Sequence, residues 1–244
     1  PWEEGFRYSL KQSQGYQSTV AANSYVTMGQ RIEAQDIAQS GWNYLSSSSY
    51  LTLSFWVMAS TAQTYYGFLK TKDGTEKMYP FSFALSANTW TKITKKIPGD
   101  SSLQFDSNNA EGLDVNISTY WGTNFTDSGT ALNTWANWSS SGRSPVNTST
   151  WFTTNGGAFE VTGLQLEVGP YATPFEHLSY AEDLTRCQRY YQQWKRGYLC
   201  GNAVGTSDIN IGVKVRIAIA MASLGLESII IFPKFTLETS ISAK

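Results

Sequence analysis

An alternation of apolar and polar side chains recurs along much of this chain. In residues 51–59, apolar side chains occupy every second position, from Leu51 through Phe55 to Ala59. A period of two puts such side chains on one face of a β-strand, whereas a helix would distribute them around its axis. The run therefore predicts a strand with one buried face.

Other segments repeat this pattern. Residues 64–83 contain two extended runs on either side of Asp73-Gly74, a dipeptide typical of hairpin turns. Residues 89–100 and 112–121 predict two more strands, each bounded by Gly or Pro. The spacing of strands and turns predicts a mainly β chain that begins with a β-sandwich.

In residues 159–169 the alternation changes parity. Phe159 and Val161 share one face, but Leu164 and Leu166 continue the pattern shifted by one position. A shift of one residue turns side chains to the opposite face of the strand. Since Gly163 stands at the change, the sequence predicts a β-bulge there.

The character of the chain changes after Pro174. Ser179 and Glu182 have the spacing of a capping box, which predicts a helix that begins at this point. Residues 209–221 then alternate again and predict a strand. We therefore expect three segments: a β-sandwich in residues 1–175, a short helical connector in 176–198 and a smaller C-terminal β unit in 199–244.

The composition limits the partners. Charged residues make up 15% of the chain, against about 25% in ordinary domains, so neutral polar groups cover the surface. The net charge of -1 argues against nucleic acid, and no stretch has the roughly 20 apolar residues of a membrane span. The chain starts without Met or a signal sequence, and we expect it to be part of a longer protein. A Cys187–Cys200 bridge is possible, but two buried thiols are the simpler interpretation.

Catalysis has little support. The chain has a single histidine, His177, which argues against acid–base and metal sites that need several histidines. The segment of residues 100–111 offers hard oxygen ligands for a structural calcium ion. Its spacing fits no EF-hand, and a plain polar loop is the alternative. The weak calcium candidates are Asp100, Asp106, Asn108 and Glu111. We expect no enzyme activity and no required cofactor.

Aromatic residues reach 14% of the chain, with 9 Trp and 14 Tyr. Tryptophan and tyrosine rings can lie against the apolar faces of sugar rings, while amides bind the hydroxyls. Aromatics near the polar loop of residues 122–158 are therefore candidates for a glycan site, and burial in a core is the alternative. The candidates are Tyr120, Trp121, Trp135, Trp138, Asn124 and Asn137. One of Tyr65 and Tyr66 should also face outward.

Several segments together resemble a module of bacteriophage tail-fibre and related virion proteins. The resemblance covers about residues 6–195 and is carried by motifs in order along the chain. They are GQRIEAQDI, LTLSFWVMAS, NTWTKITKKIPGD, GLDVNIS, TGLQLEVG, ATPFE, EDL and CQRYY.

The resemblance implies a carbohydrate-binding-like jelly roll over residues 1–175, in a protein that is commonly a homotrimer on the virion. It implies a non-enzymatic fibre or receptor-binding protein whose partners are other tail or fibre proteins and host-surface polysaccharide. It brings no catalytic motif and no metal site. The alternative is a structural virion protein, such as an adaptor, decoration or assembly component, without a glycan site.

Overall fold

The computed structural model describes residues 1–15, 19–190, 201–203, 209–211, 229–231 and 236–240. The chain divides into two compact units. The larger unit contains Pro1–Phe175 and Leu226–Lys244, and the smaller contains Glu176–Gly225. Cys200, and with it the possible Cys187–Cys200 bridge, lies outside the described residues, as does most of the strand expected in residues 209–221.

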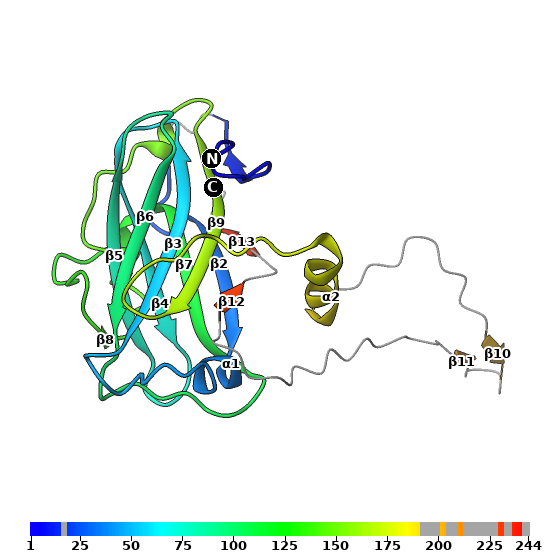
Figure 1. The fold of residues 1–244 in the computed structure, drawn as a ribbon. Coiled ribbons are helices and arrows are strands. Elements are labelled where there is room, and N and C mark those ends of the chain that lie inside the picture. The colour runs from blue at the N-terminus through cyan, green and yellow to red at the C-terminus, as the bar shows by residue number, and fades with distance from the viewer. Residues whose placement is uncertain (16–18, 191–200, 204–208, 212–228, 232–235, 241–244) are drawn as a thin grey trace. The chain divides into compact units, whose positions relative to one another are not determined.

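The larger unit consists of two antiparallel sheets (Figure 1). The strands of the first sheet are β1 (Leu10–Ser13), β3 (Tyr50–Ala59), β6 (Thr91–Pro98), β9 (Ala158–Val168) and β12 (Ile229–Ile231). The strands of the second sheet are β2 (Tyr25–Glu33), β4 (Gln63–Thr71), β5 (Lys77–Leu85), β7 (Glu111–Trp121), β8 (Ala136–Asn137) and β13 (Thr236–Ser240).

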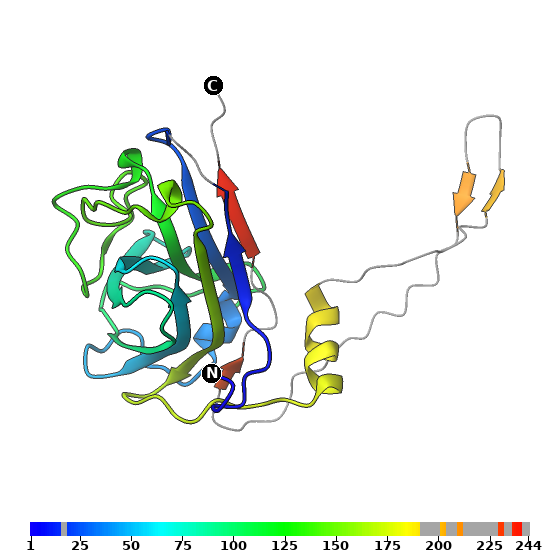
Figure 2. The same ribbon diagram turned by 90° about the horizontal axis from the view of Figure 1, so that it is seen from above.

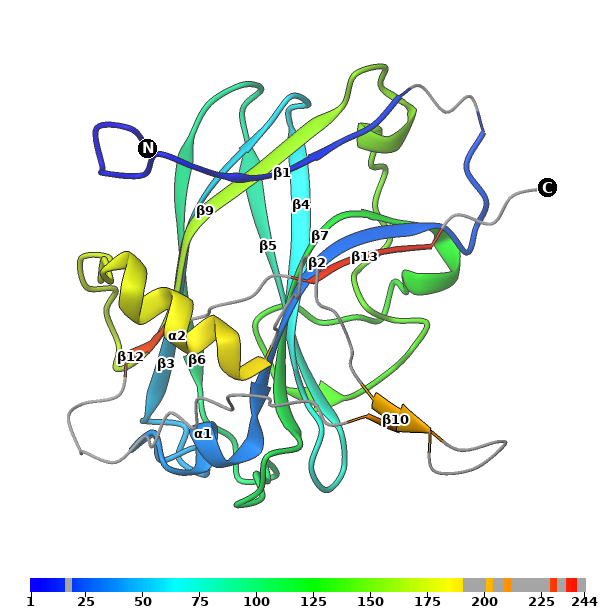
Figure 3. The same cartoon turned by 90° about the vertical axis from the view of Figure 1, so that its right-hand side faces the viewer.

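The order of the strands defines the fold. The first sheet has the order β1-β9-β3-β6, with β12 also paired to β9, and the second has the order β13-β2-β7-β4-β5-β8. Figure 3 shows β1 along β9 and β13 along β2. The paths β1-β9-β3-β6 and β2-β7-β4-β5 follow the jelly-roll order, in which two Greek keys wrap into a sandwich. The predicted mainly β sandwich is therefore confirmed.

The core lies between the two sheets, as the alternation requires. Leu53 and Phe55 of β3 face Leu69, Phe81 and Ile117 of the second sheet, and all are buried. Their period of two is the one read from the sequence. Apolar burial of this kind contributes roughly 25 cal/mol per Å² and is the main term that stabilises such a sandwich.

Two turn features predicted from the sequence are confirmed. β4 pairs with β5 in a hairpin, and Gly74 has φ +60°. On β9, Thr162 pairs with Trp56 but Gln165 pairs with Ser54, so the strand carries an extra residue. Gly163 stands at this bulge with φ +58°, a backbone conformation that only glycine adopts without strain.

Several elements were not predicted from the sequence. They are β1, β2, β8, the helix α1 (Ala34–Ala38) and the short 3-10 helices η1 (Thr123–Phe125) and η2 (Trp151–Thr153). The segment between β7 and β9, green to yellow-green in Figures 1 and 2, contains η1, β8 and η2, and only β8 pairs with a sheet. This segment is the polar loop in which the sequence placed several glycan candidates.

The end of β9 is fixed by polar contacts. Glu167 is buried and accepts hydrogen bonds from the backbone N–H of Thr173, at 3.1 Å, and from its hydroxyl. Gln165, also buried, donates to the Thr173 hydroxyl at 3.3 Å. Polar residues of the TGLQLEVG and ATPFE motifs therefore hold the chain where it leaves the sandwich. These two motifs thus have a structural role at the end of β9.

The smaller unit contains the predicted helix, α2 (Tyr180–Tyr190). Its capping box is confirmed, since the Ser179 hydroxyl and backbone N–H donate to Glu182 at 2.7 and 3.1 Å. In the same unit, β10 (Gly201–Ala203) pairs with β11 (Ile209–Ile211). The division at residues 175 and 198 stays a prediction, since much of 199–244 is outside the described residues. None of the described helices is long and apolar enough to cross a bilayer.

We predict that Gly163→Ala destabilises the larger unit more than Gly156→Ala does. Both glycines have positive φ, at +58° and +70°, so each alanine should cost about 1–2 kcal/mol. A Cβ at Gly163 would also lie 2.5 Å from the Phe6 ring, whereas a Cβ at Gly156 meets nothing within 4 Å. Urea unfolding should show about 1 kcal/mol or more of extra loss for Gly163→Ala. Equal losses would mean that Phe6 does not pack against the bulge.

Candidate functional site

The outer face of the second sheet carries a second set of aromatic residues, separate from the core. On β4, Tyr65 and Leu69 belong to the core, so the alternation turns Tyr66, Phe68 and Lys70 outward. The predicted outward tyrosine is therefore Tyr66. The polar residues that share this face come from β7, the next strand in the sheet.

A bulge in β7 decides which of two neighbouring aromatics reaches the outer face. Thr27 pairs with Ser118 but Val26 pairs with Tyr120, so Thr119 is the extra residue. Tyr120 then packs against the core, with its ring 5.2 Å from that of Phe152. Trp121 points to the opposite face.

We call the group on that face the outer aromatic cluster: Tyr25, Phe68, Met78, Trp121, Phe125 and Trp138. Trp121 is stacked on Phe68 with ring centroids 6.1 Å apart, and Trp138 lies 5.5 Å from Phe68. The cluster thus joins strands of the sheet to two positions of the polar loop.

Arg143 holds the loop on the outer aromatic cluster. Its guanidinium lies 4.4 Å from the ring centroid of Phe125, 5.0 Å from Trp121 and 5.5 Å from both Tyr25 and Trp138. Its backbone N–H donates to the Phe125 carbonyl at 2.9 Å. A cation at such distances is attracted by the ring faces. Arg143 therefore connects η1 to the segment after β8.

At the other side of the cluster, Lys70 lies 4.0 Å above the Trp138 ring and shares Glu76 with Lys72. Burial raises the pKa of Glu76, but hydrogen bonds from the two lysines outweigh it and leave the pKa below its ordinary value. Burial lowers the pKa of Lys70, while the hydrogen bond to Glu76 raises that of Lys72. The pKa of Lys70 is lowered while that of Lys72 is raised, because the Lys70 side chain is the more buried of the two.

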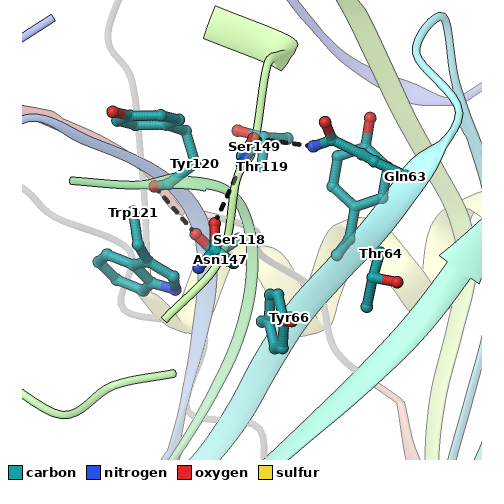
Figure 4. Close-up of a pocket in the computed structure, with 10 residues that line it drawn as sticks. Gln63, Thr64, Tyr66, Ser118, Thr119, Tyr120, Trp121, Asn147 and Ser149 are labelled. Carbon is teal, nitrogen blue, oxygen red and sulfur yellow. Dashed lines mark hydrogen bonds between the residues drawn. The ribbon is translucent and has the colours of Figure 1, made fainter. Parts of the chain in front are cut away.

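Beside the cluster, between β4 and β7, lies a small hollow (Figure 4). We call it the β4–β7 hollow. It has room for about one water molecule. It is lined by Gln63, Thr64, Tyr65, Tyr66, Ser118, Thr119, Tyr120, Trp121, Asn147 and Ser149. None of these side chains is charged at neutral pH, since burial raises the pKa of Tyr65 and Tyr120.

Hydrogen bonds hold the rim of the hollow in place. Gln63 donates to the Ser149 hydroxyl at 2.8 Å and accepts from the Thr150 backbone N–H at 3.0 Å. Asn147 accepts from the Ser149 backbone N–H at 3.3 Å, and Ser118 donates to the carbonyl of Tyr120 at 3.2 Å. The two bonds of Gln63, one of them drawn in Figure 4, hold the loop of residues 147–150 beside β4.

One donor on the wall of the hollow has no partner. Trp121 is 4% exposed, and its indole N–H has no hydrogen-bond acceptor. The indole N–H groups of Trp135 and Trp151, by contrast, donate to the carbonyls of Pro98 and Ala158 at 2.7 and 3.1 Å. In Figure 4 the indole nitrogen of Trp121 is on the ring edge that faces Asn147 and Tyr66.

The structure separates the six glycan candidates. Trp121 and Trp138 meet in the outer aromatic cluster, whereas Trp135 and Tyr120 pack against the core. Asn124 and Asn137 are exposed, and Asn137 accepts a hydrogen bond from Lys77 at 2.8 Å. Of the six, only Tyr120 and Trp121 line the hollow.

The sequence did not identify most of the polar residues around the hollow. Gln63, Ser118, Asn147 and Ser149 were not among the glycan candidates. The alternation of β4 signalled Tyr66, but the pairing of β4 with β7 joins residues about 50 positions apart, and no local pattern records that pairing.

The calcium candidates do not converge. Hydrogen bonds from Ser102 lower the pKa of Asp100, Asn108 accepts from the Ala110 backbone N–H, and Glu111 pairs with Arg31. Asp106 accepts from Gln104 at 3.1 Å. Within the described part of the chain, no three His, Cys, Asp or Glu side chains lie close enough to hold a metal ion.

A second hollow, much roomier than the β4–β7 hollow, lies beside the N-terminal segment. Its lining includes Trp2, Phe6, Arg7, Tyr8 and Trp90. Trp2 and Tyr8 are exposed, and Arg7 lies 5.6 Å from the Trp2 ring. This hollow contains a charged side chain and has no buried donor without a partner, so it differs in chemistry from the β4–β7 hollow.

We predict that Arg143→Ala lowers the free energy of unfolding by about 1–3 kcal/mol, through lost ring contacts and lost packing of the side-chain stem. Arg31→Ala is the control, because Arg31 pairs with Glu111 at 3.6 Å on an exposed surface and should contribute at most about 1 kcal/mol. Hydrogen exchange should also quicken in residues 122–147 of Arg143→Ala alone. Unchanged exchange there would contradict a role for Arg143 in holding the loop.

We predict that Glu76 contributes to the acid sensitivity of the larger unit. Its pKa is lower in the folded state than the ordinary 4.5, so its stabilising contribution is complete above that value and is lost as the pH falls through the folded pKa. Glu76→Gln should therefore be less stable than the parent chain at about pH 6.5, with the difference shrinking by about pH 3. Urea unfolding at both values checks this. A difference independent of pH would contradict it.

No family model, curated protein or solved structure matches this chain. The resemblance to tail-fibre proteins thus stays a prediction from the sequence. The fold is assigned from the order of its strands, and any function must be argued from the residues of the site.

Proposed function

We propose that the chain is a non-enzymatic virion fibre or receptor-binding protein that attaches to neutral host-surface glycans through its jelly roll. The observation that supports this best is the β4–β7 hollow, which combines the rings of Tyr66 and Trp121 with neutral amides and hydroxyls. This combination suits an uncharged sugar, whose ring has apolar faces and whose hydroxyls both donate and accept hydrogen bonds.

Charge supports the same choice of ligand. The lining of the hollow has no charged side chain, and the whole chain has a net charge of -1. An anionic sugar would lose its hydration there without gaining a cationic partner, which is unfavourable. A neutral polysaccharide is therefore the better ligand class.

One shallow hollow should bind weakly, with a dissociation constant of about 1 mM. A homotrimer would present three copies on one fibre, and the second and third contacts would then be intramolecular. Attachment would thus depend on several weak sites together, and other tail or fibre proteins would hold the trimer on the virion.

The second candidate is a structural virion protein without a glycan site. One observation favours it: Trp121 is buried, and Trp135 and Trp138 are partly buried, so these three rings form no open platform. Under this alternative the hollow is a packing gap beside the polar loop.

The test is adsorption of the labelled full chain to a panel of bacterial strains, before and after removal of surface polysaccharide. We expect adsorption that requires the polysaccharide. Tyr66→Ala should weaken it about tenfold, because a ring–sugar contact is lost. Tyr171→Ala is the matched control, since Tyr171 is exposed and does not line the hollow.

Failure of the folded protein to adsorb to strains that bind the parent particle would favour the structural alternative. Equal loss in the Tyr66 and Tyr171 variants would mean that adsorption does not use the hollow.

A further inference from the structure

We infer that the β4–β7 hollow receives the oxygen of one exocyclic, uncharged group of a saccharide, and that this oxygen accepts a hydrogen bond from the indole N–H of Trp121. The group is an acetamido or a hydroxymethyl group, since both present a neutral acceptor oxygen on a short arm. This inference rests on the proposed function and adds the part of the sugar that enters and the donor that binds it.

The indole N–H of Trp121 is a buried donor without an acceptor. A buried N–H without an acceptor is uncommon, because its lost hydration is not replaced. Trp121 is more than nine-tenths buried and lines the hollow, and its indole nitrogen is on the ring edge that faces Asn147 and Tyr66 (Figure 4). A ligand oxygen at that position would supply the missing acceptor.

The size of the hollow limits what can enter it. It has room for about one water molecule, so a whole sugar ring does not fit there. The oxygen of a short exocyclic arm can take the place of that water, while the rest of the sugar stays at the mouth beside Tyr66. The rim hydrogen bonds of Gln63 and Asn147 keep this mouth formed before the ligand arrives.

The lining of the hollow is neutral, and the Trp121 ring is held rigidly. The cations near Trp121 and its neighbours, Arg143 and Lys70, contact rings of the outer aromatic cluster and do not line the hollow. A carboxylate would therefore find no cation inside. Arg143 and Phe68 pack against the indole and fix its direction. Trp121 thus acts as an oriented neutral donor.

The experiment follows the indole N–H resonances of the full, ¹⁵N-labelled chain by NMR during sugar titrations. The probes are N-acetylglucosamine, glucose, xylose and glucuronic acid, each up to about 100 mM, well above a millimolar dissociation constant. The Trp121 signal is identified by its absence in Trp121→Phe. We expect this signal to shift with N-acetylglucosamine or glucose. Xylose lacks the exocyclic arm and glucuronic acid is charged, so both should bind at least about tenfold more weakly.

A matched pair of variants tests the donor itself. Trp42 is also buried, also has an indole N–H without an acceptor, and lies in the core, where it packs against Tyr44 and Phe105. Trp121→Phe and Trp42→Phe each remove one such group and leave a ring. We expect Trp121→Phe to weaken sugar binding about tenfold and Trp42→Phe to leave it unchanged.

The outcomes separate the two proposals. Sugar binding that leaves the Trp121 signal unmoved and is equal in Trp121→Phe would overturn the inference but keep the proposed function. A shift of the Trp2 or Trp90 signal instead would locate the sugar in the second hollow and also overturn it. Binding of xylose or glucuronic acid as strong as that of glucose would overturn the exocyclic neutral group. No binding by any probe would overturn both.

Discussion

The apolar contact between the two sheets is the constraint on which the rest of the molecule depends. Each strand must turn the same set of side chains inward over its full length, because a slip of one residue would expose them. Where a bulge adds one residue to a strand, the side chains that follow it turn to the opposite face. The bulges at Gly163 of β9 and Thr119 of β7 are two such places. The second of them brings Trp121 to the outer face.

The loop between β7 and β9 depends on this arrangement. It has few apolar residues with which to form a core of its own, so it packs on rings that the sheet presents. Arg143 supplies the central contact, since it faces rings from β2, β7, η1 and the segment after β8. The rim residues Asn147 and Ser149 follow shortly after it in the chain. The shape of the hollow is therefore a consequence of how the loop is attached.

The sequence predicts local features well and pairings poorly. The strand of residues 51–59, the turn at Gly74 and the bulge at Gly163 were readable because alternation and glycine are local signals. The bulge at Thr119 contains no glycine, so the sequence did not show that Tyr120 packs against the core while Trp121 joins the outer aromatic cluster, although both line the hollow. Trp135 packs against the core and Trp138 joins the outer aromatic cluster. Both contacts involve strands distant in the sequence, so no local pattern predicted this difference.

The two buried indoles without an acceptor, Trp121 and Trp42, differ in what surrounds them. Trp42 packs in the core against Tyr44 and Phe105, and it lines neither of the two hollows described above. Its ring fills space, which outweighs one unpaired donor, because a buried aromatic contributes more than a single hydrogen bond. Trp121 also packs well, against Phe68 and Tyr25, so packing alone accounts for its ring. What packing does not explain is why its N–H faces a neutral hollow with a preformed rim. A bound acceptor oxygen explains both the donor and the hollow.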